Sequence, residues 1–237
     1  MTNSVVIYRG PSEYDREPIV VLLSGLAHAS ANRKTGALLQ TYILVDTMKP
    51  TEAVRTGADA SICGGCKLRN NGCYVNVGQA PQSLYGALGR ATVPDVLLSD
   101  LPELAARRFV RLGSYGDPAA VPGAVWSALL AQASGHTGYT HAWRASRFQY
   151  LQQWCMASVD SDAERSLAQR LGWSTFQVRP RGDATVAVDQ SRCLASAEAG
   201  HLTTCEQCMI CGGNSRGQTH VVIQAHGSKA KRILEVV

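Results

Sequence analysis

A short loop rich in cysteine, residues 62–74, places the strongest constraint on how this chain can fold. Cys63, Cys66 and Cys73 lie in it among glycine, asparagine and charged residues, so the loop offers little apolar surface to a hydrophobic core. Thiols in such a loop are either paired in disulfides or bound to a metal. A CxxC pair with a third cysteine close behind it can give three thiolates to one metal centre and leave one coordination position open.

The amino terminus and the cysteine content together bear on the redox state of these thiols. The chain has 237 residues, 8 of them cysteine. Its first residues lack the basic and apolar regions of a signal peptide, and the most apolar run, residues 19–29, is too short to span a bilayer. We therefore expect a cytoplasmic protein with no membrane partner, in which thiols stay reduced and bind metal rather than form disulfides.

A second set of cysteines lies in a polar, glycine-rich segment near the C-terminus. Its members are Cys193, Cys205, Cys208 and Cys211. The last three form a CxxCxxC motif, which places three sulfurs on one turn as in ferredoxin-type clusters, and the first is the obvious fourth ligand. A zinc site is the main alternative, with four cysteines or with three cysteines and His220 or His226. Cys155 lies in an apolar segment and is expected to be a buried core thiol.

The order of strand and helix patterns predicts the fold class. Apolar runs predict strands at residues 5–8, 19–23, 40–45, 109–112, 154–159, 175–178 and 221–227. A helix is expected over residues 121–133, and Ser161 with Glu164 three residues later forms a capping box that begins another. Alternating strands and helices with short turns predict parallel βαβ units. We expect an α/β fold, a partial (βα) barrel with parallel strands over residues 1–186, and a cysteine-rich metal-binding extension over residues 187–237 packed on the same domain.

Polar residues follow several of the predicted strands, where parallel sheets bind their ligands. Asp117 either caps the next helix or presents a carboxylate that binds an amine, and Asp160 has the same two interpretations. His141, Trp143 and Arg144 either face a substrate pocket or are ordinary packed and surface residues. The candidate catalytic residues are therefore Asp117, Asp160 and Arg144.

Charge and phosphate-loop patterns give little indication of a partner. The formal net charge is +5, but the basic residues are spread along the chain, which only weakly indicates a polyanionic ligand. Lys34-Thr35-Gly36 lacks the glycine spacing of a Walker motif, so it does not predict a nucleotide site.

The layout resembles the radical S-adenosylmethionine (radical SAM) superfamily of partial (βα) barrels. Cys73-Tyr74 resembles the last cluster ligand and its aromatic neighbour, residues 155–161 resemble the fourth strand, and Gly116-Asp117-Pro118 resembles the Gly-Gly-Glu-Pro motif. The loop spacing, CxxC and then six residues before the third cysteine, differs from the CxxxCxxC of that family. The resemblance implies a [4Fe–4S] cluster on Cys63, Cys66 and Cys73 whose open iron chelates S-adenosylmethionine. It also implies that Gly116, Asp117 and Pro118 bind this cofactor and that the C-terminal cysteines hold an auxiliary cluster.

The Lys-Thr-Gly, Cys-Tyr-Val and Gly-Tyr-Thr-His segments are also similar to uncharacterised cysteine-rich bacteriophage proteins. That similarity implies a phage or prophage origin, and so the host cytoplasm as the location, but it supplies no activity. For a protein of that origin we expect a nucleobase or nucleic acid as the substrate. We expect an iron–sulfur enzyme of radical SAM type acting on an unknown substrate. One alternative is a zinc-containing barrel that exchanges a base in DNA or RNA, with Asp117 or Asp160 as the nucleophile. The other is a zinc-knuckle module that binds nucleic acid or protein without catalysis.

Overall fold

The computed structural model describes residues 2–30, 32–69 and 72–225. The chain forms two compact units. Unit 1 comprises Met1–Ala31, Ala37–Gly65 and Val75–His136, and unit 2 comprises Asn32–Gly36, Cys66–Tyr74 and Thr137–Val237. The division at residue 186 that the cysteine pattern predicts stays a prediction, and His226, an alternative zinc ligand, lies outside the described residues.

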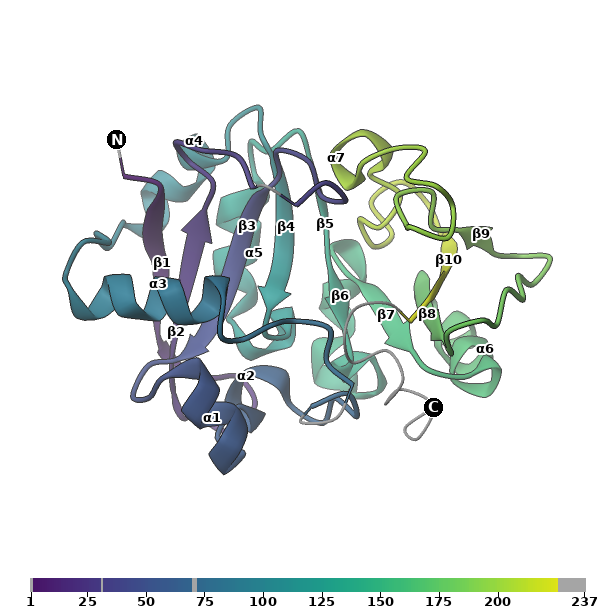
Figure 1. Ribbon diagram of the computed structural model, residues 1–237, viewed down its shortest axis with the longest axis horizontal. Coiled ribbons are helices and arrows are strands. Elements are labelled where there is room, and N and C mark those ends of the chain that lie inside the picture. The colour runs from purple at the N-terminus through teal and green to yellow at the C-terminus, as the bar shows by residue number, and fades with distance from the viewer. Residues whose placement is uncertain (1, 31, 70–71, 226–237) are drawn as a thin grey trace. The chain divides into compact units, whose positions relative to one another are not determined.

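Unit 1 is built around a mixed five-stranded sheet in the order β1-β2-β3-β4-β5 (Figure 1). Its strands are β1 (Ser4–Pro11), β2 (Pro18–Ser24), β3 (Leu39–Val45), β4 (Phe109–Tyr115) and β5 (Gly135–Thr137). The first three pair antiparallel and β3 pairs parallel with β4. All five residues from Ile19 to Leu23 are 0% exposed, which is the continuous apolar run expected of a strand covered on both faces.

Helices and short helical turns complete unit 1. They are α1 (Pro50–Thr56), α2 (Ala60–Cys63), α3 (Ala80–Gly89), η1 (Leu98–Asp100), α4 (Leu101–Leu104), η2 (Pro118–Ala120) and α5 (Gly123–Leu130). Both α1 and α3 pack against β3. The predicted helix over residues 121–133 is present as α5 but is shorter at both ends. It begins after Pro122 and ends at Leu130.

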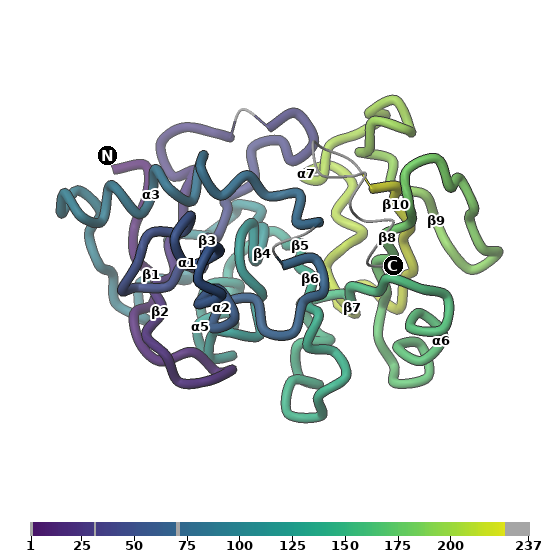
Figure 2. The backbone as a smooth tube through the Cα atoms, turned by 60° about the horizontal axis from the view of Figure 1, so that its bottom comes forward, coloured from purple at the N-terminus to yellow at the C-terminus, as the bar shows by residue number. Residues whose placement is uncertain are grey.

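Unit 2 is built around a second five-stranded sheet, in which every neighbouring pair of strands is parallel. The order is β6-β7-β8-β10-β9. The strands are β6 (Tyr139–Thr140), β7 (Met156–Val159), β8 (Thr175–Arg179), β9 (Ser191–Arg192) and β10 (His220–Gln224), and the helical segments are η3 (Ala142–Arg144), η4 (Ser146–Gln153), α6 (Asp162–Arg170) and α7 (Cys205–Cys208). Helix α6 connects β7 to β8 and packs against both, the βαβ unit that the sequence predicts (Figure 2).

The predicted α/β class is confirmed: the structure combines helices with two sheets that contain parallel strands, and the described residues form no closed barrel. The partial barrel and the cysteine-rich extension stay predictions. In the described part of the chain we find no helix with the length and apolar character needed to cross a bilayer.

The predicted capping box at the start of α6 forms only in part. The Oγ atom of Ser161 accepts a hydrogen bond from the backbone N–H of Glu164 at 3.2 Å, as predicted. The carboxylate of Glu164 accepts instead from the backbone N–H of Asp160 at 2.9 Å, one residue before the cap. Glu164 is therefore held at the carboxyl end of β7.

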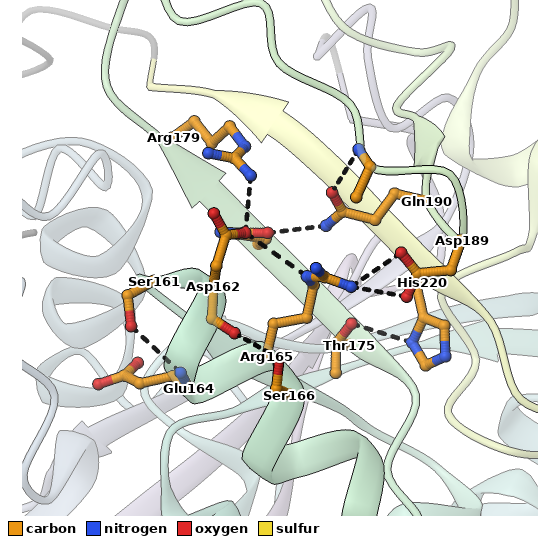
Figure 3. Close-up of polar contacts among 12 residues, drawn as sticks. Ser161, Asp162, Glu164, Arg165, Ser166, Thr175, Arg179, Asp189, Gln190 and His220 are labelled. Carbon is orange, nitrogen blue, oxygen red and sulfur yellow. Dashed lines mark hydrogen bonds and ion pairs between the residues drawn. The ribbon is translucent and has the colours of Figure 1, made fainter.

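A polar network ties α6 to the segment that precedes β9 (Figure 3). Arg165 donates from Nη1 to both carboxylate oxygens of Asp189, at 2.8 and 2.6 Å, and Gln169 donates to Asp189 at 2.6 Å. Gln190 is 8% exposed and donates to Gln177 of β8 at 2.7 Å. These bonds fix the chain just before it reaches Cys193.

Candidate functional site

Four cysteines of unit 2 line one cavity of about 310 Å³, which we call the four-cysteine cavity. They are Cys193, Cys205, Cys208 and Cys211. Lys34, Tyr139 and Met209 are among the other lining residues. All four cysteines of the predicted C-terminal metal site thus line the same cavity, and their binding of a metal stays a prediction.

The backbone around the cavity is fixed from several directions. Helix α7 begins with a capping box between Thr204 and Gln207. The N–H groups of Cys205 and Glu206 donate to the carbonyls of Lys34 and Thr35, at 2.8 and 3.2 Å. The segment Asn32–Gly36 therefore satisfies the first N–H groups of the helix that carries two of the cysteines.

Two further contacts place the remaining cysteines. The N–H of Cys193 donates to the carbonyl of Val222 in β10 at 2.9 Å, and the carbonyl of Cys211 accepts from Gly138 at 3.0 Å. Met209 ends α7 in the left-handed conformation, with φ of 50°, which turns the chain toward Cys211.

Burial raises the pKa of two of these thiols, Cys211 and Cys193. It raises the pKa of Cys211 to about 12, a hydrogen bond from Tyr139 acts in the opposite direction, and the other three cysteines raise the pKa further. Burial also raises the pKa of Cys193, although the charge of Lys34 lowers it in part. Such thiols are neutral without a metal, and a bound metal would deprotonate them.

The four thiols are donors of the type that iron–sulfur clusters and structural zinc sites use. No group of three His, Cys, Asp or Glu side chains within the described ranges is placed to hold a metal ion. Sulfurs that share one tetrahedral zinc ion lie about 3.8 Å apart, which follows from a Zn–S distance of about 2.3 Å. The four cysteines are among thirteen described residues that line the cavity of about 310 Å³.

A second group of polar residues gathers at the carboxyl ends of β6 and β7, and we call it the carboxyl-edge cluster. Its members are Cys66, Lys67, His141, Arg144, Asp160 and Glu164. His141 and Asp160 are the first residues after β6 and β7, which are parallel neighbours. Ligands of parallel sheets bind at such strand ends.

The segment after Gly65 reaches this edge because Leu68 is buried there. Leu68 is 6% exposed and belongs to an apolar cluster with Ala225, just after β10, against which Cys66 and Val178 pack. Lys67 forms an ion pair with Glu164 at 2.8 Å, and the Sγ atom of Cys66 lies 3.7 Å from Nε2 of His141.

Glu164 connects most of the cluster. Its side chain is 11% exposed and its carboxylate contacts Lys67 at 2.8 Å, Arg144 at 2.7 Å and the N–H of Asp160 at 2.9 Å. Burial raises the pKa of Glu164, but these three hydrogen bonds together with the charge of Arg144 outweigh it and lower the pKa to about 2. Glu164 is therefore a carboxylate at every physiological pH.

Asp160 is the buried carboxyl group of the cluster that has an unused acceptor. The residue is 4% exposed, and its Oδ1 atom has no hydrogen-bond partner among the described residues. Burial raises the pKa of Asp160, the charge of His141 lowers it, and the charge of Glu164 raises it again, with a raised pKa as the net result. A buried polar atom without a protein partner is costly, and a water molecule or a ligand binds such an atom.

The other predicted site residues lie elsewhere or have structural roles. Asp117 belongs to unit 1, is 6% exposed, and caps η2 by accepting from the N–H of Ala119 at 2.9 Å. Gly116 has φ of +82° and a Cβ there would lie 2.6 Å from the Cβ of Ile43, so packing alone requires glycine. The predicted binding of a cofactor by Gly116, Asp117 and Pro118 stays a prediction.

The predicted site on the early cysteines also stays a prediction, because Cys63 belongs to unit 1 whereas Cys66 and Cys73 belong to unit 2. Cys155 is 0% exposed, as expected of a core thiol. His220 forms a hydrogen bond with Thr175 at 3.0 Å and is not among the described residues that line the four-cysteine cavity.

Sequence reasoning missed four residues of the two sites: Lys34, Lys67, Tyr139 and Glu164. Only Glu164 carried a signal, as the partner of Ser161 in the capping box, and that signal indicated a helix start.

Comparison with family models, curated proteins and solved structures finds no match for this chain.

Proposed function

We propose that this chain is an iron–sulfur protein in which Cys193, Cys205, Cys208 and Cys211 bind a [4Fe–4S] cluster. The observation that carries the proposal is that these four side chains, which come from two segments of unit 2, line one cavity. The CxxCxxC spacing of Cys205, Cys208 and Cys211 favours a cluster over a single zinc ion.

A cluster bound by four thiolates has no open iron position. Such a centre suits electron transfer or the stabilisation of a fold, and its potential depends on burial and on hydrogen bonds to the sulfurs. Tyr139 supplies one such hydrogen bond, to Cys211. The other assignments drawn from the sequence remain predictions: the radical SAM reaction with S-adenosylmethionine, the exchange of a base, and the binding of nucleic acid.

Anaerobic reconstitution with iron and sulfide tests the proposal. The expected product is brown and contains about four iron and four acid-labile sulfide for this centre. Cys208→Ser should lose that iron and sulfide together, whereas Cys155→Ala, which removes a buried thiol outside the cavity, should keep both. A protein that takes up zinc and no sulfide, or a Cys208→Ser variant with unchanged iron, would contradict the proposal.

A further inference from the structure

We propose that Cys66 is a nucleophilic thiol, with His141 as its base and Asp160 as the anchor of a substrate of the amide or amidine class. The inference concerns the carboxyl-edge cluster and does not depend on the four-cysteine cavity. It gives Cys66 a role different from the metal ligand that the sequence predicts, and the test separates the two.

The contact between Cys66 and His141 has the geometry of an activated thiol. The Sγ–Nε2 separation is 3.7 Å, within hydrogen-bond reach for sulfur, and nucleophile–base contacts are often loose before substrate binds. Both residues are partly exposed, so a substrate can reach the thiol. The two residues come from segments 75 positions apart in the sequence, so the fold itself creates the pair.

Asp160 provides the second, independent observation. Its carboxyl group is buried next to His141 and has an unused Oδ1 acceptor among the described residues. Glu164 does not compete for this role, because Lys67, Arg144 and the N–H of Asp160 already occupy its carboxylate. A substrate with an N–H donor beside its electrophilic carbon would satisfy Oδ1, and the charge of Asp160 would stabilise the imidazolium of His141.

The reaction needs no oxidant or reductant. The proton of the Cys66 thiol passes to Nε2 of His141, and the thiolate forms a carbon–sulfur bond with the electrophilic carbon. The bond between that carbon and its leaving group breaks, and the leaving group takes the proton from His141. A second attack, by water or another nucleophile, then releases the product and restores the thiol.

Two small alkylating probes test the proposal on the full chain: chloroacetamidine and chloroacetamide. Each forms a carbon–sulfur bond and releases chloride, and peptide mass mapping reports the modified fraction of each cysteine. Cys73, from the same loop, is the internal control. At about pH 6.5, Cys66 should react at least tenfold faster than Cys73, because Nε2 of His141 lies beside its thiol and can accept its proton.

Three variants assign the roles. His141→Gln should slow alkylation of Cys66 by about tenfold or more with both probes and leave Cys73 unchanged. Asp160→Asn should lower the preference of Cys66 for the amidine probe over the amide probe, and the control Asp183→Asn, at a half-buried carboxylate outside the cluster, should not. Equal rates at Cys66 and Cys73 in the wild-type protein would overturn the proposal. So would protection of Cys66 that ends when a chelator is added, since that result identifies a metal ligand.

Discussion

Tyr139 begins β6 and His141 follows its last residue, and each of the two side chains contacts a cysteine. Tyr139 forms a hydrogen bond with Cys211 in the four-cysteine cavity. His141 lies 3.7 Å from Cys66 in the carboxyl-edge cluster. One short strand therefore links the proposed cluster site to the proposed nucleophile, and the two can be tested by separate substitutions.

Removing the hydroxyl of Tyr139 should change the potential of the cluster more than its occupancy. A hydrogen bond to a ligating sulfur stabilises the more negative, reduced state, so Tyr139→Phe should lower the reduction potential. A bond worth about 1 kcal/mol corresponds to roughly 40 mV for one electron. Anaerobic redox titration measures this shift. An unchanged potential with full iron content would show that Tyr139 does not contact a cluster ligand.

Glu164 should make the stability of the protein depend on pH in the acid range. The pKa of Glu164 is lowered to about 2 in the folded state. Its contribution to the free energy of unfolding is therefore complete above the unfolded pKa of about 4.3. The contribution is lost as the pH falls toward 2. Lys67 and Arg144 are 51% and 49% exposed, so water screens the pairs and we expect about 1–2 kcal/mol.

Urea unfolding between about pH 2 and pH 7 checks the Glu164 prediction. Glu164→Gln should lower the free energy of unfolding at neutral pH and flatten its decline with acid. The exposed Glu103→Gln is the matched control and should stay within about 0.5 kcal/mol of the wild type. The prediction fails if the two variants behave alike.

Alanine substitutions at two glycines of unit 2 compare the destabilisation caused by steric crowding with that caused by backbone conformation alone. Both have positive φ, +64° at Gly213 and +90° at Gly217. A Cβ at Gly213 would lie 2.5 Å from the carbonyl oxygen of Gln152 and 2.7 Å from the backbone nitrogen of Cys155, whereas nothing lies within 4 Å at Gly217. Gly217→Ala should cost about 1 kcal/mol, and Gly213→Ala about 2–4 kcal/mol because a clash is added.

Thermal unfolding and iron content compare the two glycine variants. Since Gly213 lies two residues after Cys211, its alanine variant should also bind less iron. Equal destabilisation of the two variants would show that backbone conformation alone sets the cost.

Asp189 should control the order of the segment that leads to Cys193. Its carboxylate accepts hydrogen bonds from Arg165 at 2.6 and 2.8 Å and from Gln169 at 2.6 Å. Asp189→Asn weakens the charge-assisted bonds, so hydrogen exchange of residues 189–193 should speed up while that of β7 stays slow. Exchange rates that do not change in this segment would show that the backbone bond of Cys193 to Val222 suffices.

Local patterns predicted several of the strands and the start of α6, for reasons visible in particular residues. The continuous apolar run at Ile19–Leu23 forms β2, and Ser161 caps α6 as its spacing with Glu164 indicates. The cysteines of the CxxCxxC motif line one cavity with Cys193, because residues spaced on one turn stay close together, whereas their role as metal ligands stays a prediction.

Contacts between distant segments could not be predicted in the same way. The contact of Cys66 with His141 depends on the burial of Leu68 against Ala225, and no sequence spacing encodes that pairing. Lys34-Thr35-Gly36 lacks a nucleotide-binding pattern. The carbonyls of Lys34 and Thr35 nevertheless accept hydrogen bonds from the first N–H groups of α7. Asp117 and Asp160 have similar positions after strands, and both are buried. The structure alone distinguishes the helix cap at Asp117 from Asp160, whose Oδ1 atom has no partner among the described residues.

Native mass spectrometry of the anaerobically reconstituted chain tests the central claim most directly. The account predicts that the wild-type protein gains the mass of a [4Fe–4S] cluster that Cys211→Ser does not bind and Cys155→Ala does. An equal mass gain in wild type and Cys211→Ser, or a wild-type gain of zinc alone, would contradict it.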